Sequence, residues 1–278
     1  MKYISLLFTI SLALLFGLTS CDSTSNNAGT GTMSISMTDA PANYDAVTIT
    51  VNSIRVNQEE DAEDTDGKES DEEAEDEGWV TIMNDPMEIN LLELTNGNQI
   101  TLGSQELEAG NYSQIRLILG DNNTVTVDGE TYALQTPSAQ QSGLKLNVDA
   151  EVEEESTYNL LIDFDAARSI VQQGNGGYLL KPVIRAVNLA EAGSIIGNVQ
   201  PTDFNTNVLA VVDEDTITST ITADNGGFQI IGLQEGTYDV VFDPSSDQYS
   251  DSTQTDIEVT SGAETDLGTI ELESNSAL

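Results

Sequence analysis

Short segments in which apolar and polar residues alternate make up most of the chain from Thr32 onwards. An alternation with a period of two residues predicts strands that bury one face. Within residues 45–57, the apolar positions are Val47, Ile49 and Val51, followed by Ile54 and Val56. This shift of phase predicts a β-bulge near Asn52 and Ser53. We therefore expect a protein built from sheets.

Turn signals are frequent and helix signals are rare. Residues 124–134 predict a tight hairpin, because Asp128 and Gly129 tolerate positive φ and lie between two alternating runs. Residues 87–94 and 165–172 are the candidates for helices, and both are short.

The second part of the chain has a regular spacing of strands. A strand from Tyr178 to Val187, in which Pro182 favours an edge position, is followed by a boundary at residues 190–193. Beyond it we expect seven strands, at residues 194–199, 207–213, 216–223, 227–231, 236–242, 254–259 and 267–272. Short strands at this spacing predict a small β-sandwich.

The predicted fold class is thus all-β. An N-terminal antiparallel β-sandwich-like domain is expected at residues 32–190, with an acidic insertion at 58–78. A smaller C-terminal seven-stranded β-sandwich is expected at 192–273, followed by a tail at 274–278.

The first residues have the pattern of an export signal. Lys2 precedes a short apolar stretch, and residues 1–20 as a whole are typical of a secretory signal peptide. The sequence Leu18-Thr19-Ser20-Cys21 resembles a bacterial lipobox, in which the cysteine is lipidated. Residues 21–31 are then a flexible tether. We expect export and lipid anchoring through Cys21 to the bacterial cell envelope, at the outer membrane or cell surface rather than the inner membrane; the alternative is an ordinary signal peptide with an incidental cysteine.

The amino-acid composition limits the kinds of catalytic and metal-binding site that the chain can form. The chain contains no histidine, and Cys21 is its one cysteine. Ser-His-Asp catalysis is therefore excluded, and a zinc site is not expected. We predict no catalytic residues, no cofactor and no enzyme activity, although carboxylate-only hydrolysis and calcium binding stay open.

Negative charge is spread over the whole chain. Without Lys2 there are 7 basic and 48 acidic residues, and the insertion at 58–78 holds 13 of the acidic ones. Self-repulsion of this size destabilises a compact state unless salt screens it. We expect a salt-loving source and stability that rises with NaCl. Nucleic acid is excluded as a partner, because its binding needs a basic surface.

The acidic insertion is a weak candidate for calcium. Asp64 and Asp66 are the residues considered, but the sequence around them lacks an acidic first position and does not fit an EF-hand loop. Runs of like charge are usually solvated. We favour a solvated loop.

Asp163 and Asp165 lie two residues apart and share one face of a strand. They could form an acid/base pair. Ion pairing is the alternative that we favour, because basic residues within apolar strands need partners. The basic residues of this domain outside the insertion are Arg55, Arg116, Lys145, Arg168, Lys181 and Arg185. Replacing Arg116 or Lys181 with Met is then predicted to alter stability more than binding.

Aromatic residues offer one further candidate. Trp79, the one tryptophan, begins a strand and is expected in the core. Tyr249 lies in a predicted loop and is a weak candidate for a ligand platform.

Two stretches resemble known families. The residues that carry the first resemblance are Met37-Thr38-Asp39-Ala40-Pro41, Ser142-Gly143-Leu144-Lys145-Leu146, Asp163-Phe164-Asp165-Ala166 and Leu179-Leu180-Lys181-Pro182-Val183-Ile184-Arg185. Residues 32–188 resemble the domain of unknown function 4382 of bacterial lipoproteins, which implies location and fold. The second pattern is Thr222-Ala223-Asp224, Gly227-Phe228-Gln229-Ile230, Gly232-Leu233, Gly236-Thr237-Tyr238-Asp239-Val240, Ile257-Glu258-Val259, Gly262 and Leu267-Gly268-Thr269-Ile270. Through it, residues 193–272 resemble the carboxypeptidase regulatory-like, or prealbumin-like, domains.

Together these features predict a non-catalytic envelope lipoprotein for binding, adhesion or scaffolding. Its expected partners are membrane lipid, through Cys21, and a glycan or an envelope protein. A carbohydrate-binding lipoprotein is the first alternative, since some carboxypeptidase regulatory-like domains are carbohydrate-binding-like. A carboxylate-only hydrolase and a calcium-dependent structural module are the others.

Overall fold

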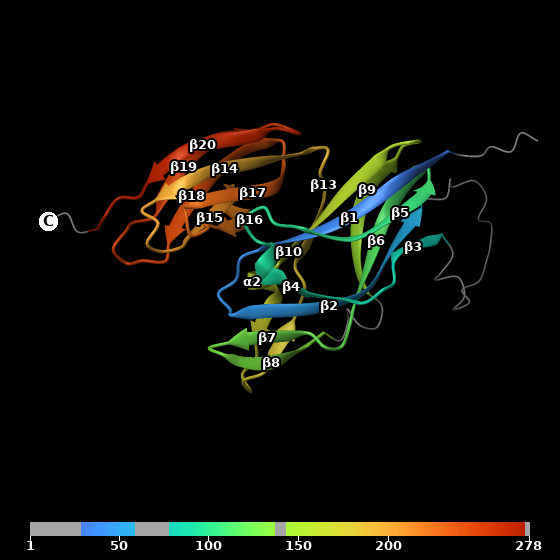
Figure 1. Ribbon diagram of the computed structural model, residues 1–278, viewed down its shortest axis with the longest axis horizontal. Coiled ribbons are helices and arrows are strands. Elements are labelled where there is room, and N and C mark those ends of the chain that lie inside the picture. Colours follow the sequence, from blue (N-terminus) through green and yellow to red (C-terminus); the bar gives the residue numbers. More distant parts are fainter. Residues whose placement is uncertain (1–28, 59–77, 137–142, 276–278) are drawn as a thin grey trace, which may run out of the picture.

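The computed structural model describes residues 29–58, 78–136 and 143–275. These residues form two β modules that lie side by side (Figure 1). The first module contains strands β1 to β13, and the second contains β14 to β20. The all-β fold class is confirmed.

One sheet of the first module has four strands in the order β13-β10-β1-β5. Their bounds are β1 (Thr30–Ala40), β5 (Ile100–Glu108), β10 (Thr157–Asp165) and β13 (Ile184–Asn188). The two central strands, β1 and β10, pair in parallel. The sandwich is therefore mixed rather than antiparallel throughout, because the chain returns to β1 through a long connection that includes the other sheet.

The other sheet of the first module has nine strands, with the path β11-β12-β8-β7-β2-β6-β9 and with β3 and β4 also paired to β2. The bounds are β2 (Ala46–Gln58), β3 (Trp79–Met83), β4 (Met87–Asn90), β6 (Gly110–Leu119), β7 (Thr124–Val127), β8 (Glu130–Gln135), β9 (Leu144–Val152), β11 (Ile170–Gln172) and β12 (Tyr178–Leu180). A register shift between Val51 and Ser53 confirms the predicted bulge. Positive φ at Asp128 and Gly129 confirms the predicted hairpin of β7 and β8.

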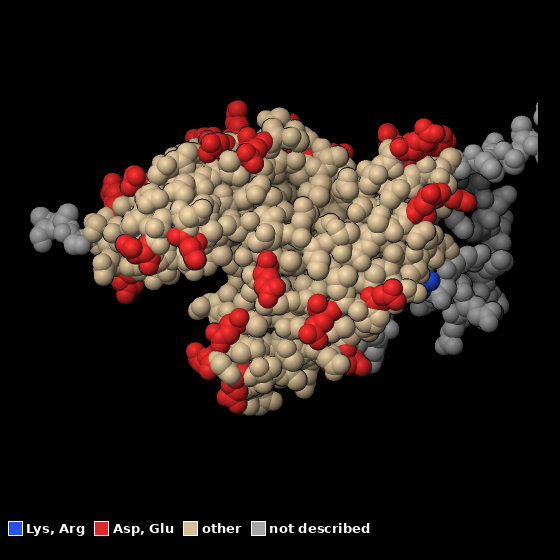
Figure 2. Space-filling view, in the orientation of Figure 1, with Lys and Arg blue, Asp and Glu red and all other residues tan. Residues whose placement is uncertain are grey.

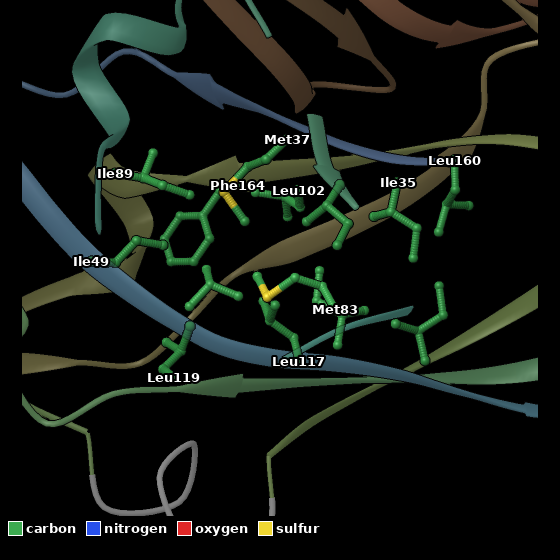
Figure 3. Packing of buried hydrophobic residues seen from close by; sticks show 14 of the residues in the cluster. Ile35, Met37, Ile49, Met83, Ile89, Leu102, Leu117, Leu119, Leu160 and Phe164 are labelled. Carbon is green, nitrogen blue, oxygen red and sulfur yellow. The ribbon is translucent and has the colours of Figure 1, made fainter. Parts of the chain in front are cut away.

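The core of this module lies between the two sheets. Figure 3 shows Met37 and Phe164, from the four-stranded sheet, facing Ile49 and Leu119 from the other. All four side chains are fully or almost fully buried. The alternation of the sequence explains this core, since the inward-facing residue of each pair is apolar.

Three local expectations are correct only in part. Residues 87–94 form strand β4, paired with β2, and then a 3-10 helix η2 (Leu91–Leu94), because sheet pairing overrides the weak helical pattern. Residues 165–172 form one helical turn, α2 (Ala166–Ser169), and then β11. The expected strand from Tyr178 to Val187 is two strands in different sheets. Pro182 lies in the segment between these two strands. Proline has no N–H to donate to a neighbouring strand, so it interrupts a sheet.

The second module has the seven expected strands, in a three-stranded sheet β17-β14-β20 and a four-stranded sheet β16-β15-β18-β19. The bounds are β14 (Ala192–Gln200), β15 (Thr206–Val212), β16 (Asp215–Ile221), β17 (Gly227–Gln234), β18 (Gly236–Pro244), β19 (Ser252–Val259) and β20 (Glu264–Glu271). Its core includes Phe228 and Phe242, whose ring centroids lie 5.6 Å apart. Carboxylates are scattered over the visible surface of both modules (Figure 2).

Candidate functional site

A buried ion pair lies where the two modules meet. Asp163 on β10 is 6% exposed, and its Oδ2 accepts hydrogen bonds from Arg185 Nε at 3.1 Å and from Arg185 Nη2 at 2.6 Å. Arg185 Nη1 donates to the carbonyl oxygen of Gly232, on β17 of the second module, at 2.8 Å. One guanidinium thus connects a carboxylate of the first module to the backbone of the second.

Asn96 makes a second connection. It follows η2 with a φ of 57°, and its Oδ1 accepts from the backbone N–H of Gln229 at 2.7 Å while its Nδ2 donates to the carbonyl oxygen of Gly227 at 3.3 Å. Its own backbone N–H donates to Thr220 Oγ1 at 2.9 Å. Because β17 is an edge strand of its sheet, this side chain satisfies backbone groups that would otherwise face solvent.

Apolar contacts complete the junction. Leu161, Val187 and Ala192 form a small buried cluster, against which Ile231 of the second module packs. We call the ion pair, the Asn96 contacts and this cluster the seam. It combines apolar burial with satisfied polar groups, which is the composition of a stable interface rather than of a linker.

Asp39 is an unusual carboxyl group beside the seam. It is 3% exposed. Its Oδ1 accepts from the backbone N–H of Ala166 at 3.0 Å, and its Oδ2 has no hydrogen-bond partner among the described residues. Its pKa is raised to about 9, chiefly by burial; the charges of Asp163 and Asp165 also raise the pKa, and the hydrogen bond from Ala166 lowers it. Asp39 is therefore protonated at neutral pH.

Asp163 and Asp165 are both held by arginines. Burial raises the pKa of Asp163, while Arg185 and Thr218 act against that rise. Asp165 caps α2, accepting from the backbone N–H of Arg168 at 2.8 Å, and it pairs with Arg168 Nε at 2.5 Å. The predicted ion pairing of these two aspartates is confirmed.

A groove of about 620 Å³ lies between the modules, next to this site. One wall is formed by the loop after β1, including Asn43, together with α2 of the first module. The other wall is the outer face of the sheet β16-β15-β18, including Leu209 and Asp243. Figure 2 shows a notch in the outline between the modules.

Three other basic residues are neighbours on one sheet face. Arg116 on β6 is opposite Arg55 on β2 and opposite Lys145 on β9. The guanidinium of Arg116 lies 4.3 Å from the ring centroid of Trp79, which is half-buried rather than in the core. Cross-strand like charges are destabilising. Among the described residues, Arg116 contacts the ring of Trp79 and forms no ion pair, so the ion pairing expected for Arg116 is not observed.

The remaining predicted candidates have different outcomes. Tyr249 is half-buried and packs against Phe204, with ring centroids 5.0 Å apart. Lys181 is exposed. Cys21, Asp64 and Asp66 lie outside the described residues, so lipidation and calcium binding stay predictions.

In the described part of the chain, no group of three or more Asp, Glu, Cys or His residues could hold a metal ion. Within those same residues, no helix has the length and apolar character needed to cross a membrane.

Sequence reasoning missed Asn96 and Asp39. Asn96 precedes Gly97, and this dipeptide is a turn signal that could have marked the loop. Asp39 lies among apolar residues and small residues, where a charged residue is unexpected; that placement was the available signal.

Comparisons with known proteins follow the same division. The family model described as domain of unknown function (DUF4382) matches residues 30–182. The model described as carboxypeptidase regulatory-like domain matches residues 204–273. Both predicted resemblances are confirmed, in the predicted order. No curated protein matches the chain.

Several solved structures are similar to the chain. The minor pilin GBS52 of Streptococcus agalactiae is 12% identical with a TM-score of 0.23, over 88% of this chain and 98% of the pilin. The shaft pilin SpaA of Lactobacillus rhamnosus GG is 8% identical with a TM-score of 0.25, over 90% and 99%. The TIE protein of Bacillus anthracis is 9% identical with a TM-score of 0.22, over 88% of this chain, which spans 34% of that protein.

Proposed function

The chain belongs to the family described as domain of unknown function (DUF4382), and from this premise we propose that it is an exported, lipid-anchored, non-catalytic protein of the bacterial cell envelope. Its two β modules are displayed as one body for binding, adhesion or scaffolding. The outer membrane or cell surface is the proposed location, and membrane lipid is the proposed partner through Cys21.

The seam supports the proposal that the two modules are displayed as one body. A guanidinium, an amide side chain and an apolar cluster all join the modules. Flexibly linked domains have no need of such contacts. A surface that includes residues of both modules can then keep a fixed shape, which binding and scaffolding both require.

The surroundings of Asp39, Asp163 and Asp165 support a non-catalytic role. A carboxylate-only hydrolase needs one group free to donate a proton and another free to attack or to activate water. Asp163 and Asp165 are each engaged by an arginine. Asp39, although protonated, borders a cavity of about 10 Å³, which is too small for a sugar or peptide substrate.

The anchor is proposed from the sequence. Residues 1–20 have the pattern of a signal peptide, and Cys21 follows the lipobox-like Leu18-Thr19-Ser20. Each buried methylene contributes about 0.8 kcal/mol, so two or three acyl chains hold a protein on a membrane almost permanently, whereas one chain does not.

Fractionation of bacterial cells tests the anchor. The wild-type chain is expected to remain with membranes through washes in high salt, and to incorporate labelled palmitate. Cys21→Ser is expected to lose both properties, whereas Ser23→Ala, in the tether, is expected to retain them. Membrane association of Cys21→Ser equal to that of the wild type would contradict the proposal.

A further inference from the structure

The groove between the modules has polar side chains that the fold does not use. Asn43, Asn207 and Asp243 line it, and none of these side chains makes a hydrogen bond to another described residue. The volume of about 620 Å³ is within the roughly 300–1,000 Å³ that is typical of ligand sites. Sites between domains are also a preferred place for ligands.

Asn207 and Asp243 are placed together by strand register. They are directly opposite in the antiparallel pair β15–β18, so their side chains share one face at a Cβ separation of about 4.5–5.5 Å. A carboxylate accepts hydrogen bonds, and an amide both donates and accepts. A ligand with two neighbouring hydroxyl groups satisfies this combination.

The same wall carries apolar side chains that the core does not use. Leu209 is half-buried on the outer face of β15, while its strand neighbours Val208 and Ala210 face the core. Ile221 on β16 is opposite Asn207 and also lines the groove. An outer sheet face next to solvent is ordinarily polar. A ligand with both C–H and O–H groups matches this mixed wall.

The charges in and around the groove argue against ionic ligands. Arg168 lines the groove, but Asp165 neutralises it, which leaves the single charge of Asp243. The whole chain has a formal charge of −40, so an anionic polymer is repelled. One carboxylate among amides and hydroxyls is also a poor site for a polycation, which needs several.

We propose that this groove binds an uncharged oligosaccharide, with Asn207 and Asp243 hydrogen-bonded to sugar hydroxyls and with Leu209 and Ile221 in contact with the sugar C–H faces. The inference rests on the proposed binding role and names the class of ligand. It does not depend on the lipid anchor.

The test uses the full chain without its signal peptide, with methyl-labelled Leu and Ile, in 2 M NaCl. The probes are neutral tetrasaccharides of glucose, xylose, mannose, galactose and N-acetylglucosamine at millimolar concentration, with spermidine and a basic peptide as competitors. We expect at least one tetrasaccharide to shift the methyl resonances of Leu209 and Ile221, with an affinity unchanged between 0.2 and 2 M NaCl, because a neutral ligand is not screened.

Variants locate the site. Asn207→Ala/Asp243→Ala is expected to weaken binding about tenfold or more, since each removes a hydrogen bond and one of the two is charge-assisted. Asn111→Ala/Asp121→Ala, which changes an exposed Asn and an exposed Asp outside the groove, is expected to leave binding unchanged.

Three results would overturn the inference. The first is that no tetrasaccharide of the panel shifts the two methyl groups. The second is that only the cationic probes bind and that 2 M NaCl abolishes their binding. The third is saccharide binding that survives the groove variant and is lost in Tyr249→Ala. If the protein is lipid-anchored in the envelope and gives any of these results, the groove site is refuted. The proposed function is then not affected.

Discussion

Two arginine–aspartate pairs near the seam differ in burial, and this difference predicts different costs of breaking them. In the pair Asp163–Arg185, the side chains are 6% and 26% exposed, whereas in Asp165–Arg168 they are 13% and 54% exposed. Removing one partner of a buried pair leaves an uncompensated charge and costs about 3–5 kcal/mol. A surface pair contributes about 0–1 kcal/mol.

Arg185→Met is therefore expected to destabilise the protein by about 3 kcal/mol, the low end of the range for buried pairs because Arg185 is a quarter exposed. That loss corresponds to a fall in melting temperature of roughly 6–12 °C for a protein of this size. Arg168→Met, the matched control, is expected to cost less than about 1 kcal/mol. Urea unfolding in 1 M NaCl, followed by circular dichroism, measures both.

Two further measurements identify the cause. Asp163→Asn in the Arg185→Met background removes the unpaired charge and is expected to recover a large part of the loss. Burial raises the pKa of Asp163 and Arg185 opposes that rise, so Arg185→Met leaves the rise unopposed, and its deficit should shrink as the pH falls from 7 to 5. Equal costs for Arg185→Met and Arg168→Met, or no recovery in the double variant, would refute the reasoning.

Three other perturbations test neighbouring parts of the account. The pKa of Asp39, about 9 when folded against an ordinary 3.8, means that the folded state binds a proton that the unfolded state releases above about pH 4. Stability should fall between pH 6 and 9 by up to about 1.4 kcal/mol per pH unit in the wild type, and an unchanged slope in Asp39→Asn would contradict this. Asn96→Gly, which keeps the positive φ, should cost about 1–2 kcal/mol by losing two hydrogen bonds; Asn96→Ala should cost about 1 kcal/mol more through backbone strain, and a Gly variant as stable as the wild type in urea unfolding would count against the seam. Melting temperature should rise from 0.1 to 2 M NaCl because salt screens the self-repulsion, and a flat profile would remove the salt-dependence argument.

Alternation of apolar and polar residues predicted many of the strands of this protein. The bulge after Val51, the hairpin at Asp128-Gly129 and the seven strands of the second module follow from period and turn chemistry, which are local. The parallel pairing of β1 with β10 does not follow from them. It depends on how strands distant in sequence are ordered, and strand alternation is the same in both directions.

The same limit applies to the site. The pairing of Asp163 and Asp165 with basic residues was predicted, because buried charges need partners. Which arginine would pair with which aspartate was not predictable, since Arg185 reaches Asp163 through the register of β10 with β13. The seam and the groove exist because two modules meet there, and no pattern within one module indicates where the other will lie.

The central claim is that the seam holds the two modules as one body, and residual dipolar couplings of backbone amides test it most directly. If the claim is right, the couplings from β1–β13 and from β14–β20 of the wild type fit a single alignment tensor, and Arg185→Met/Asn96→Gly gives two different tensors. Two different tensors in the wild type, with each module individually well fitted, would contradict the claim.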